Sequence, residues 1–163
     1  MNKNKVIISL GSNLGDRKEN LLTALKMLNE FSNIIYKSRI FHSEPWGFNS
    51  KNMFLNLGVL IGTTLTPIAL LNNLKKIEFI MGRRTKQKYI YEDRLIDLDI
   101  LIYENFKIVS NKIHLPHPKI NERKFLLLIL KDIYSKNPIM GLNKTADEIL
   151  EKCVDKTKVS VFE

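Results

Sequence analysis

The sequence predicts a single α+β domain over residues 1–163, with a largely antiparallel sheet. The segments read in the order β-α-β-β-α-β-β-α, and several neighbouring strand segments are joined by short turns. A parallel, doubly wound sheet requires a helix between successive strands, so this order argues against one. Glycine (7) and proline (5) are scarce, which argues against a flexible linker between two domains.

A change in the spacing of apolar residues predicts the first strand and the first helix. The aliphatic run 6–10 predicts a short buried strand, and the glycine-containing stretch 11–16 predicts a tight turn after it. Leu21, Leu25 and Leu28 then recur at helical spacing on one face. We therefore expect a strand, a turn and an amphipathic helix.

Two strands and a second helix are expected next. The segments 34–43 and 54–62 are strand-like, with a break at 44–47 between them. Thr66 followed by proline is typical of a helix start, so a helix is predicted over 67–81.

The C-terminal half predicts two more strands and a helix. A strand is expected over 97–103, a turn at 104–105 and a return strand over 106–109. The stretch 125–130 is apolar on all sides and is interpreted as a buried helix, although its periodicity also allows a strand.

The charge balance favours an anionic partner. Lysine and arginine number 26 against 17 acidic residues, a formal charge of +9. Nucleic acid, an acidic membrane or a phosphorylated small molecule would each suit this charge. No run of about 18 apolar residues occurs, so a membrane span is not expected. With Cys153 as the sole cysteine, we expect a cytoplasmic protein without an internal disulfide.

Two aspartates in an aliphatic strand give the strongest local signal. Because side chains alternate across a strand, one continuous apolar face is expected from Ile96, Leu98, Ile100 and Ile102. Asp97 and Asp99 then share the other face, with carboxylates about 7 Å apart. Such oxygen ligands suit one or two magnesium ions shared with phosphate. The alternative to metal binding is that this face of the strand is exposed to solvent and the two aspartates only hydrate it.

A cationic stretch lies just before these aspartates. No acid occurs between 83 and 91, and the cations are Arg83, Arg84, Lys86 and Lys88. Arg94 follows, three residues before Asp97. Cations and carboxylates this close suggest a ligand that is both anionic and metal-bound, such as a nucleoside triphosphate. A solvated loop is the alternative.

Glu78 falls within the apolar stripe of the second helix. A carboxylate in that position is costly unless it is paired or lines a pocket. The alternative is that the helix end lies at the surface, where Glu78 reaches water.

A rigid loop around His117 is a further candidate. Prolines on both sides hold His117 in a fixed direction, and Arg123 and Phe125 follow closely. The imidazole and guanidinium could contact phosphate, and the phenyl ring could stack on a planar ligand. An ordinary turn is the alternative. His42 is interpreted as structural, and His114 is left open.

Together these residues resemble the 6-hydroxymethyl-7,8-dihydropterin pyrophosphokinase family. The resemblance extends over nearly the whole chain in order, and it is carried by the segments 11–15, 44–47, 54–56, 77–78, 82–83, 94–101, 116–118 and 123–125. It implies a ferredoxin-like α+β fold in an α/β/α arrangement. It also implies transfer of pyrophosphate from ATP to the pterin hydroxymethyl group, with release of AMP.

The resemblance also implies roles for individual residues. Asp97 and Asp99 would hold two magnesium ions, and Arg83 and Arg94 would complete the catalytic set. The pterin would be bound by Ser43, Glu44, Pro45, Trp46, Phe54, Asn56 and Phe125. ATP would be bound by Lys75, Glu78, Arg84, Lys86, Lys88, Ile100, Lys112, His114, His117 and Arg123.

The sequence departs from the family pattern in one stretch. Many members carry Trp-Gly-Pro-Arg before the aspartates, where this chain has Tyr-Glu-Asp-Arg over 91–94. This leaves open which of Arg84, Lys86 and Lys88 contacts phosphate. We expect a monomer that binds ATP and a pterin and has no nucleic-acid or membrane partner. The alternatives are a ferredoxin-like RNA-binding module and a kinase that moves only the γ-phosphate.

Overall fold

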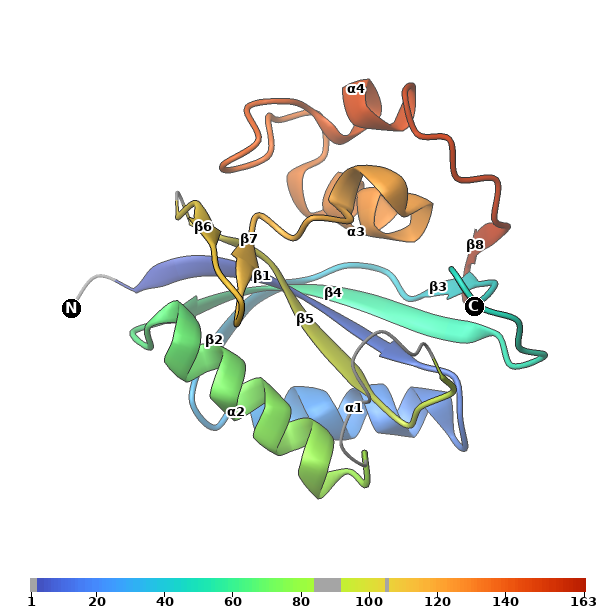
Figure 1. Cartoon of the computed structure of the whole chain (residues 1–163), viewed down its shortest axis with the longest axis horizontal. Helices are drawn as coiled ribbons and strands as arrows, with labels where there is room; N and C mark the ends of the chain where they lie inside the picture. Colours follow the sequence, from blue (N-terminus) through green and yellow to red (C-terminus); the bar gives the residue numbers. More distant parts are fainter. Residues whose placement is uncertain (1–2, 84–91, 105) are drawn as a thin grey trace.

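A six-stranded antiparallel sheet forms the centre of the fold (Figure 1). Its strands are β1 (Asn4–Ser12), β2 (Asn33–Lys37), β3 (Phe41–Ser43), β4 (Phe54–Thr63), β5 (Asp97–Tyr103) and β8 (Val159–Val161). Their order is β5-β1-β4-β3-β8, with β2 also paired to β4. The structure is a computed structural model and describes residues 3–83, 92–104 and 106–163. The predicted α+β class and antiparallel sheet are confirmed.

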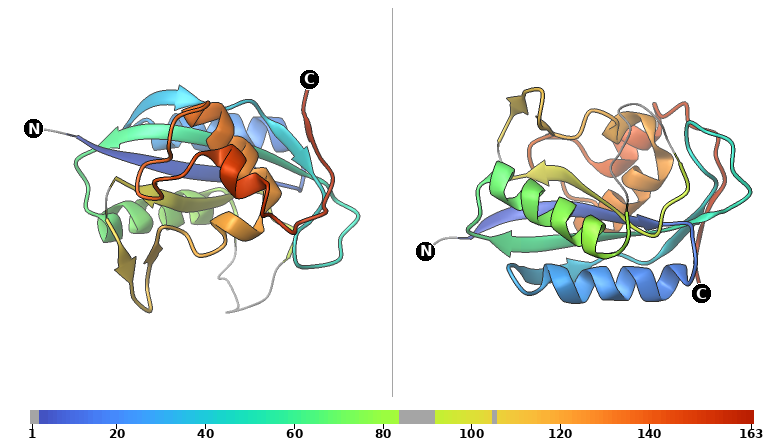
Figure 2. Two further views of the ribbon diagram at one scale, coloured as in Figure 1. Left: turned by 90° about the horizontal axis from the view of Figure 1, so that it is seen from above. Right: turned by 60° about the horizontal axis from the view of Figure 1, so that its bottom comes forward.

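Helices cover both faces of this sheet (Figures 1 and 2). One face carries α1 (Arg17–Leu28) and α2 (Pro67–Ile80), and the other carries α3 (Lys124–Tyr134) and α4 (Ala146–Leu150). Each face has its own apolar core, because alternate strand residues point to opposite sides. In the part of the chain that the structure describes, no helix has the length and apolar character needed to cross a bilayer.

The start of α2 follows the capping predicted at Thr66, and α1 is capped in the same way by Asp16. The Asp16 side chain accepts a hydrogen bond from Glu19 N at 3.0 Å, and the Thr66 hydroxyl accepts one from Ala69 N at 3.3 Å. These bonds satisfy backbone donors that the first turn leaves unpaired. The apolar run 125–130 is helical, as predicted, and belongs to α3.

A β-bulge in β5 overturns the predicted continuous apolar face. Ile100 pairs with Ile8 and Ile102 pairs with Ile7, so Leu101 is an extra residue opposite β1. Ile96, Leu98 and Ile100 pack under α1 and α2 as expected. Leu101 and Ile102 instead pack against α3. The prediction was wrong for Ile102, because the alternation shifts by one residue at the bulge.

The predicted strand 34–43 is in fact two strands, β2 and β3. Between them, Ser38 forms two hydrogen bonds with Gly58 of β4. Its backbone N–H donates to the Gly58 carbonyl at 2.9 Å, and its hydroxyl accepts from Gly58 N at 2.9 Å. Both strands still pair with β4. The hydroxyl replaces a regular ladder bond, so pairing is interrupted here without leaving a buried donor unpaired.

The prediction of a return strand over 106–109 was partly wrong. A short strand, β6 (Ile108–Val109), does form there, but it pairs with β7 (His114–Leu115) instead of β5. Beyond it, η1 (Ile120–Glu122) leads into α3. The C-terminal strand β8 was not predicted, and it pairs with β3. The pairing of β6 with β7 and the pairing of β8 with β3 position segments next to the candidate site.

Candidate active site

A pocket lies at the end of the sheet where β4 and β5 begin. We call it the first pocket. It contains every residue that the resemblance assigned to the pterin except Pro45. The described residues of the predicted catalytic set that line it are Arg94, Asp97 and Asp99. Segments far apart in sequence therefore meet here.

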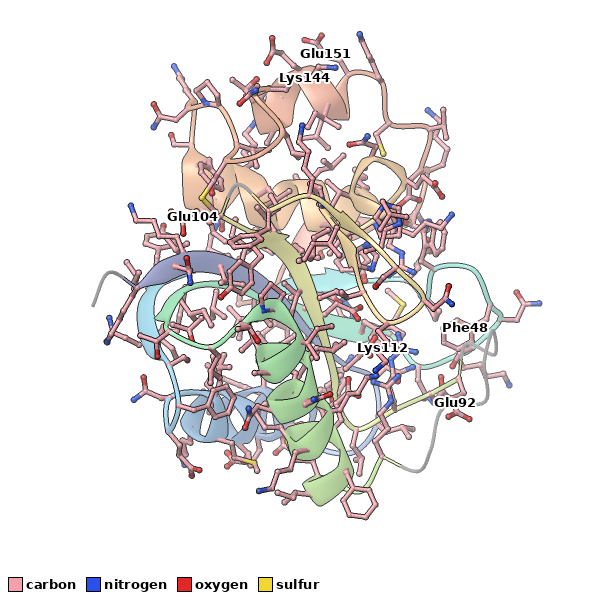
Figure 3. All side chains as sticks on the ribbon, turned by 60° about the vertical axis from the view of Figure 1, so that its left-hand side comes forward. Phe48, Glu92, Glu104, Lys112, Lys144 and Glu151 are labelled. Atoms are coloured by element: carbon pink, nitrogen blue, oxygen red, sulfur yellow. The ribbon has the colours of Figure 1, made fainter. Side chains whose placement is uncertain are left out.

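A second pocket lies between α2 and the segment 110–118. Four residues predicted to bind ATP line it, namely Ile100, Lys112, His114 and His117. Asp99 lines both pockets, so the two hollows adjoin at β5. Figure 3 shows Lys112, from the second pocket, and Phe48, from the first, on the same side of the molecule.

Asp97 and Asp99 point to the same face of β5, as predicted. In the β1–β5 ladder, Asp97 lies opposite Gly11 and Asp99 lies opposite Ser9. A Cβ on Gly11 would come within 3.2 Å of Asn56 Oδ1, closer than most such contacts. Glycine in this position therefore keeps the floor of the pocket open.

Arginines neutralise the more deeply buried of the two aspartates. Asp97 is only 8% exposed, and it accepts hydrogen bonds from Arg83 Nη1 and, at 2.8 Å, from Arg94 Nη2. Two guanidinium groups thus offset the charge of one buried carboxylate. In contrast, Asp99 forms no ion pair within the described residues, and it is half-buried.

Glu78 is paired rather than solvated. It is 8% exposed, and its Oε1 lies 2.5 Å from Arg83 Nη1 and accepts a hydrogen bond from Leu98 N at 2.8 Å. Burial alone lowers the pKa of Arg83, but the charges of Asp97 and Glu78 outweigh it and raise the pKa above its usual value. The alternative in which Glu78 reaches water at the helix end is wrong.

Arg94 is fixed at both its backbone and its side chain. Its N–H donates to Asn13 Oδ1 at 2.7 Å, and its carbonyl accepts from Asn13 N at 3.1 Å. Its guanidinium carbon lies 5.3 Å from the centre of the Phe54 ring, within the range of a cation–π contact. Arg94 therefore connects an aromatic wall of the first pocket to Asp97.

The opposite wall of the first pocket is made of Trp46, Arg123 and the start of α3. The Arg123 guanidinium carbon lies 4.5 Å from the Trp46 ring centre. Arg123, predicted to contact ATP, thus lines the same pocket as the predicted pterin residues.

Two buried polar side chains of this pocket are joined by a hydrogen bond. Asn56 donates from Nδ2 to Ser43 Oγ at 2.8 Å, which orients the Asn56 amide.

The loop at His117 is hydrogen-bonded to β5 at the bulge residue Leu101. His117 N donates to the Leu101 carbonyl at 2.8 Å, and His117 Nδ1 accepts from Lys119 N at 3.1 Å. With Nδ1 acting as acceptor, the neutral ring carries its proton on Nε2. The predicted fixed direction of His117 thus places it in the second pocket. His42 lies 3.4 Å from Arg17 Nη1 and lines neither of these two pockets.

The remaining predicted residues are not gathered into the two pockets. Lys75 is exposed on α2 and lines neither one. Glu78 and Arg83 line neither pocket, but Arg83 pairs with Asp97 and Glu78 pairs with Arg83. Three predicted ATP contacts, Arg84, Lys86 and Lys88, lie outside the described residues.

Several lining residues were not found from the sequence. Ser9 and Gly11 lie opposite the aspartates on β1, and the same two-residue period could have found them once the strands were paired. Phe48 follows Trp46 in the 44–53 loop, where no periodicity applies. Asn13 and Asp93, which line neither pocket but hold Arg94 in place, could not be found, because their roles depend on contacts across about 80 residues, as the Asn13–Asp93 hydrogen bond shows.

The donor set fits magnesium bound together with phosphate. Within the described ranges, no cluster of three or more acidic, histidine or cysteine side chains could hold a metal by itself. Asp97 and Asp99 offer two hard oxygen ligands and leave most of the coordination shell to phosphate oxygens and water. Mg²⁺ typically binds in this way, with one or two carboxylates and the phosphates of a substrate.

Comparison with known proteins shows the same likeness along most of the chain. Residues 7–135 match the family model described as 7,8-dihydro-6-hydroxymethylpterin-pyrophosphokinase. A 2-amino-4-hydroxy-6-hydroxymethyldihydropteridine pyrophosphokinase from Porphyromonas gingivalis is 40% identical over 131 residues, covering 78% of this chain and 89% of that protein. A protein of the same name from Aquifex aeolicus is 38% identical over 128 residues, covering 78% and 79%.

The fold is also found in a solved structure. The crystal structure of an HPPK-DHPS in complex with substrates superposes with a TM-score of 0.73 at 17% identity. The match covers 93% of this chain and 43% of that longer chain. At this low identity the likeness concerns the fold alone, and it agrees with the ferredoxin-like α+β prediction.

Proposed function

The chain belongs to the 7,8-dihydro-6-hydroxymethylpterin-pyrophosphokinase family, and on this premise we propose which residues carry each part of the reaction. The enzyme transfers the pyrophosphoryl group of ATP to the hydroxymethyl group of 6-hydroxymethyl-7,8-dihydropterin, releasing AMP, in folate biosynthesis. The alternative of an RNA-binding module has no support in these relationships. A cytoplasmic, monomeric enzyme is our further prediction.

The first pocket is the proposed pterin site. Phe54 and Phe125 both line it and offer rings on which a flat heterocycle can stack. Ser43 and Asn56 lie on its floor with their polar groups oriented by one hydrogen bond. These groups, with the 44–46 segment, would recognise the polar edge of the pterin.

The second pocket is the proposed nucleotide site. Lys112, His114 and His117 supply positive or hydrogen-bonding groups for phosphate, and Ile100 supplies an apolar contact. Lys75 lies one helical turn beyond Leu71, which lines this pocket, so its side chain can reach the same face of α2. Arg123, Arg84, Lys86 and Lys88 are proposed as further phosphate contacts, with Glu78 near the nucleotide.

One observation carries this assignment: Asp99 lines both pockets. A pterin in the first and a triphosphate in the second would therefore meet at β5. Asp97 and Asp99 would hold the proposed two Mg²⁺ ions there, and the ions would offset the negative charge of the phosphates. Transfer requires the acceptor oxygen to lie in line with the bond to the leaving AMP.

The arginines have two tasks in this scheme. Arg83 and Arg94 would orient the Asp97 carboxylate through their ion pairs with it. They also place positive charge where negative charge develops during transfer. Glu78 pairs with Arg83 and would help to hold its guanidinium at Asp97.

Product analysis tests this proposal. The protein is incubated with ATP, Mg²⁺ and 6-hydroxymethyl-7,8-dihydropterin, and the nucleotides and pterins are separated by chromatography. We expect AMP and a pyrophosphorylated pterin in equal amounts, and no AMP when the pterin is omitted. Formation of ADP in place of AMP would contradict the proposal, because it would indicate transfer of the γ-phosphate alone.

A further inference from the structure

The residue before Arg94 connects three separate parts of the site. Both carboxylate oxygens of Asp93 accept side-chain hydrogen bonds: Oδ1 from Asn13 Nδ2 at 2.6 Å, and Oδ2 from Asn52 Nδ2 at 2.5 Å. Asn13 follows β1, and Asn52 lies in the loop before β4. Asp93 therefore bridges two segments that are 39 residues apart in sequence.

Asn13 completes this network with its remaining polar groups. The side chain is 3% exposed, and its oxygen accepts from the N–H of Arg94 at 2.7 Å. Its Nδ2 also donates to the Asn52 carbonyl at 3.2 Å. The peptide of Arg94 is thus held by an amide that Asp93 orients, and this amide has few other positions available.

The network reaches both walls of the first pocket. The loop that contains Asn52 also carries Trp46 and Phe48, which line that pocket. Arg94 lies over the Phe54 ring and pairs with Asp97. Figure 3 shows Glu92, the neighbour of Asp93, on the same flank as Phe48.

The charge of Asp93 is suited to this role. Burial by itself raises its pKa, but hydrogen bonds from Ser50, Asn52 and Asn13 outweigh that effect and leave the pKa below its usual value. Asp93 therefore stays ionised at neutral pH and accepts all of these bonds. Its position falls in the stretch 91–94, where this chain departs from the family pattern.

We propose that Asp93 is a positioning residue, which fastens the 44–53 loop to the backbone of Arg94 and so aims the Arg94 guanidinium at Asp97. This inference rests on the proposed function, because Arg94 is taken to act on the transferring group. Asp93 itself lines neither pocket and touches neither substrate site. Its contribution would therefore reach the reaction through Arg94.

The first test compares steady-state kinetics of three variants. Asp93→Ala removes the carboxylate that accepts from Asn13 and Asn52, and we expect kcat to fall about tenfold or more while KM for each substrate changes less than about threefold. Asp93→Asn keeps one acceptor oxygen and should lose less. The matched control is Asp132→Ala, which removes a carboxylate that also accepts several bonds, from Arg39, away from both pockets. Its kcat should be unchanged.

A double-mutant cycle separates positioning from a general loss of structure. If Asp93 acts through Arg94, then Asp93→Ala in an Arg94→Ala background should lower kcat less than about twofold. An equal loss in both backgrounds would overturn the inference. So would an unchanged kcat in a folded Asp93→Ala protein. If Asp93→Ala does not fold, the same comparison of kcat is made with Asp93→Asn in the unmodified and the Arg94→Ala backgrounds, and it tests the inference in the same way.

A second readout does not depend on catalysis. Trp46 is the sole tryptophan of the chain, so its fluorescence reports on the 44–53 loop. Releasing the loop should increase acrylamide quenching of Trp46 about 1.5-fold or more in Asp93→Ala, and not in Asp132→Ala. Unchanged quenching would contradict the inference. If the unmodified protein releases no AMP, the proposed function fails, and the quenching comparison still decides the role of Asp93.

Discussion

The two halves of β5 have opposite surroundings. Its first half, 97–100, directs two carboxylates into the pockets and carries the ion pairs with Arg83 and Arg94. Its second half, 101–103, buries Leu101, Ile102 and Tyr103 completely or almost completely. The bulge at Leu101 separates the halves, and it lets neighbouring residues pack into both cores.

The difference shows how a strand can carry charges that disfavour folding. Carboxylates are depleted in strands, and burying them costs free energy. Packing of the apolar half on both faces of the sheet holds β5 in register with β1 and so keeps the aspartates in place. We therefore expect substitutions in the first half to change turnover, and substitutions in the second half to change stability.

The largest effect is expected from the aspartates. Asp99→Ala should lower kcat/KM about a thousandfold, or about 4 kcal/mol, because phosphate-bound metal would lose a ligand. Its unfolding free energy should change little, since Asp99 forms no ion pair within the described residues. Asp97→Ala should lose similar activity and also about 3 kcal/mol of stability, because Arg83 and Arg94 lose their shared partner.

Steady-state kinetics and urea unfolding of both variants measure these two quantities. The account predicts that the variants resemble each other in turnover and differ in stability. If Asp99→Ala turned over substrate almost as fast as the unmodified enzyme, this would contradict the claim that the first half of β5 serves turnover and the second half serves stability.

The second effect concerns the apolar half. Leu101 is fully buried among residues of α3 and α4. Leu101→Ala should lower the unfolding free energy by about 3 kcal/mol through lost burial and a cavity, with kcat unchanged below the unfolding transition. Val109→Ala, at an exposed position, is the matched control and should leave stability within about 0.5 kcal/mol of the unmodified protein. A large fall in kcat for Leu101→Ala would show that the two halves are coupled.

The smallest effect concerns Tyr103, at the end of the same strand. Burial raises the pKa of its phenol above 10, and its hydroxyl donates to the Leu65 carbonyl and accepts from Asn4 Nδ2 at 3.2 Å. Tyr103→Phe should cost about 1 kcal/mol at neutral pH by removing these bonds.

The pH dependence of this variant has a definite sign. Because the folded state holds the Tyr103 proton more tightly than the unfolded state, its contribution is complete below the unfolded pKa, about 10. It is lost as the pH rises through the folded pKa. Urea unfolding at pH 8 and above pH 10 should therefore show a smaller alkaline loss for Tyr103→Phe. An equal loss in both proteins would mean that Tyr103 titrates alike in the two states.

Local patterns predicted the parts of the fold that depend on near neighbours. The shared face of Asp97 and Asp99 follows from the two-residue period of a strand, and the helix start at Thr66 follows from capping. Both were confirmed because nothing beyond a few residues decides them.

Features set by distant contacts were not predictable in the same way. Ile102 changes face because of a bulge against β1, and β8 pairs with β3, which lies far from it in the sequence. The sequence indicated that Glu78 needed a partner or a pocket, but not that Arg83 would join it to Asp97. The resemblance supplied residue roles that periodicity could not supply, and those roles await the experiments above.

The most direct test of the account is manganese binding, followed by electron paramagnetic resonance. Mn²⁺ takes the same oxygen ligands as Mg²⁺ and is titrated into the protein with a non-hydrolysable ATP analogue present. The account predicts that the unmodified enzyme binds Mn²⁺ in the presence of the nucleotide. At the same nucleotide concentration, Asp99→Ala should bind little Mn²⁺. Equal Mn²⁺ binding by the two proteins would contradict it.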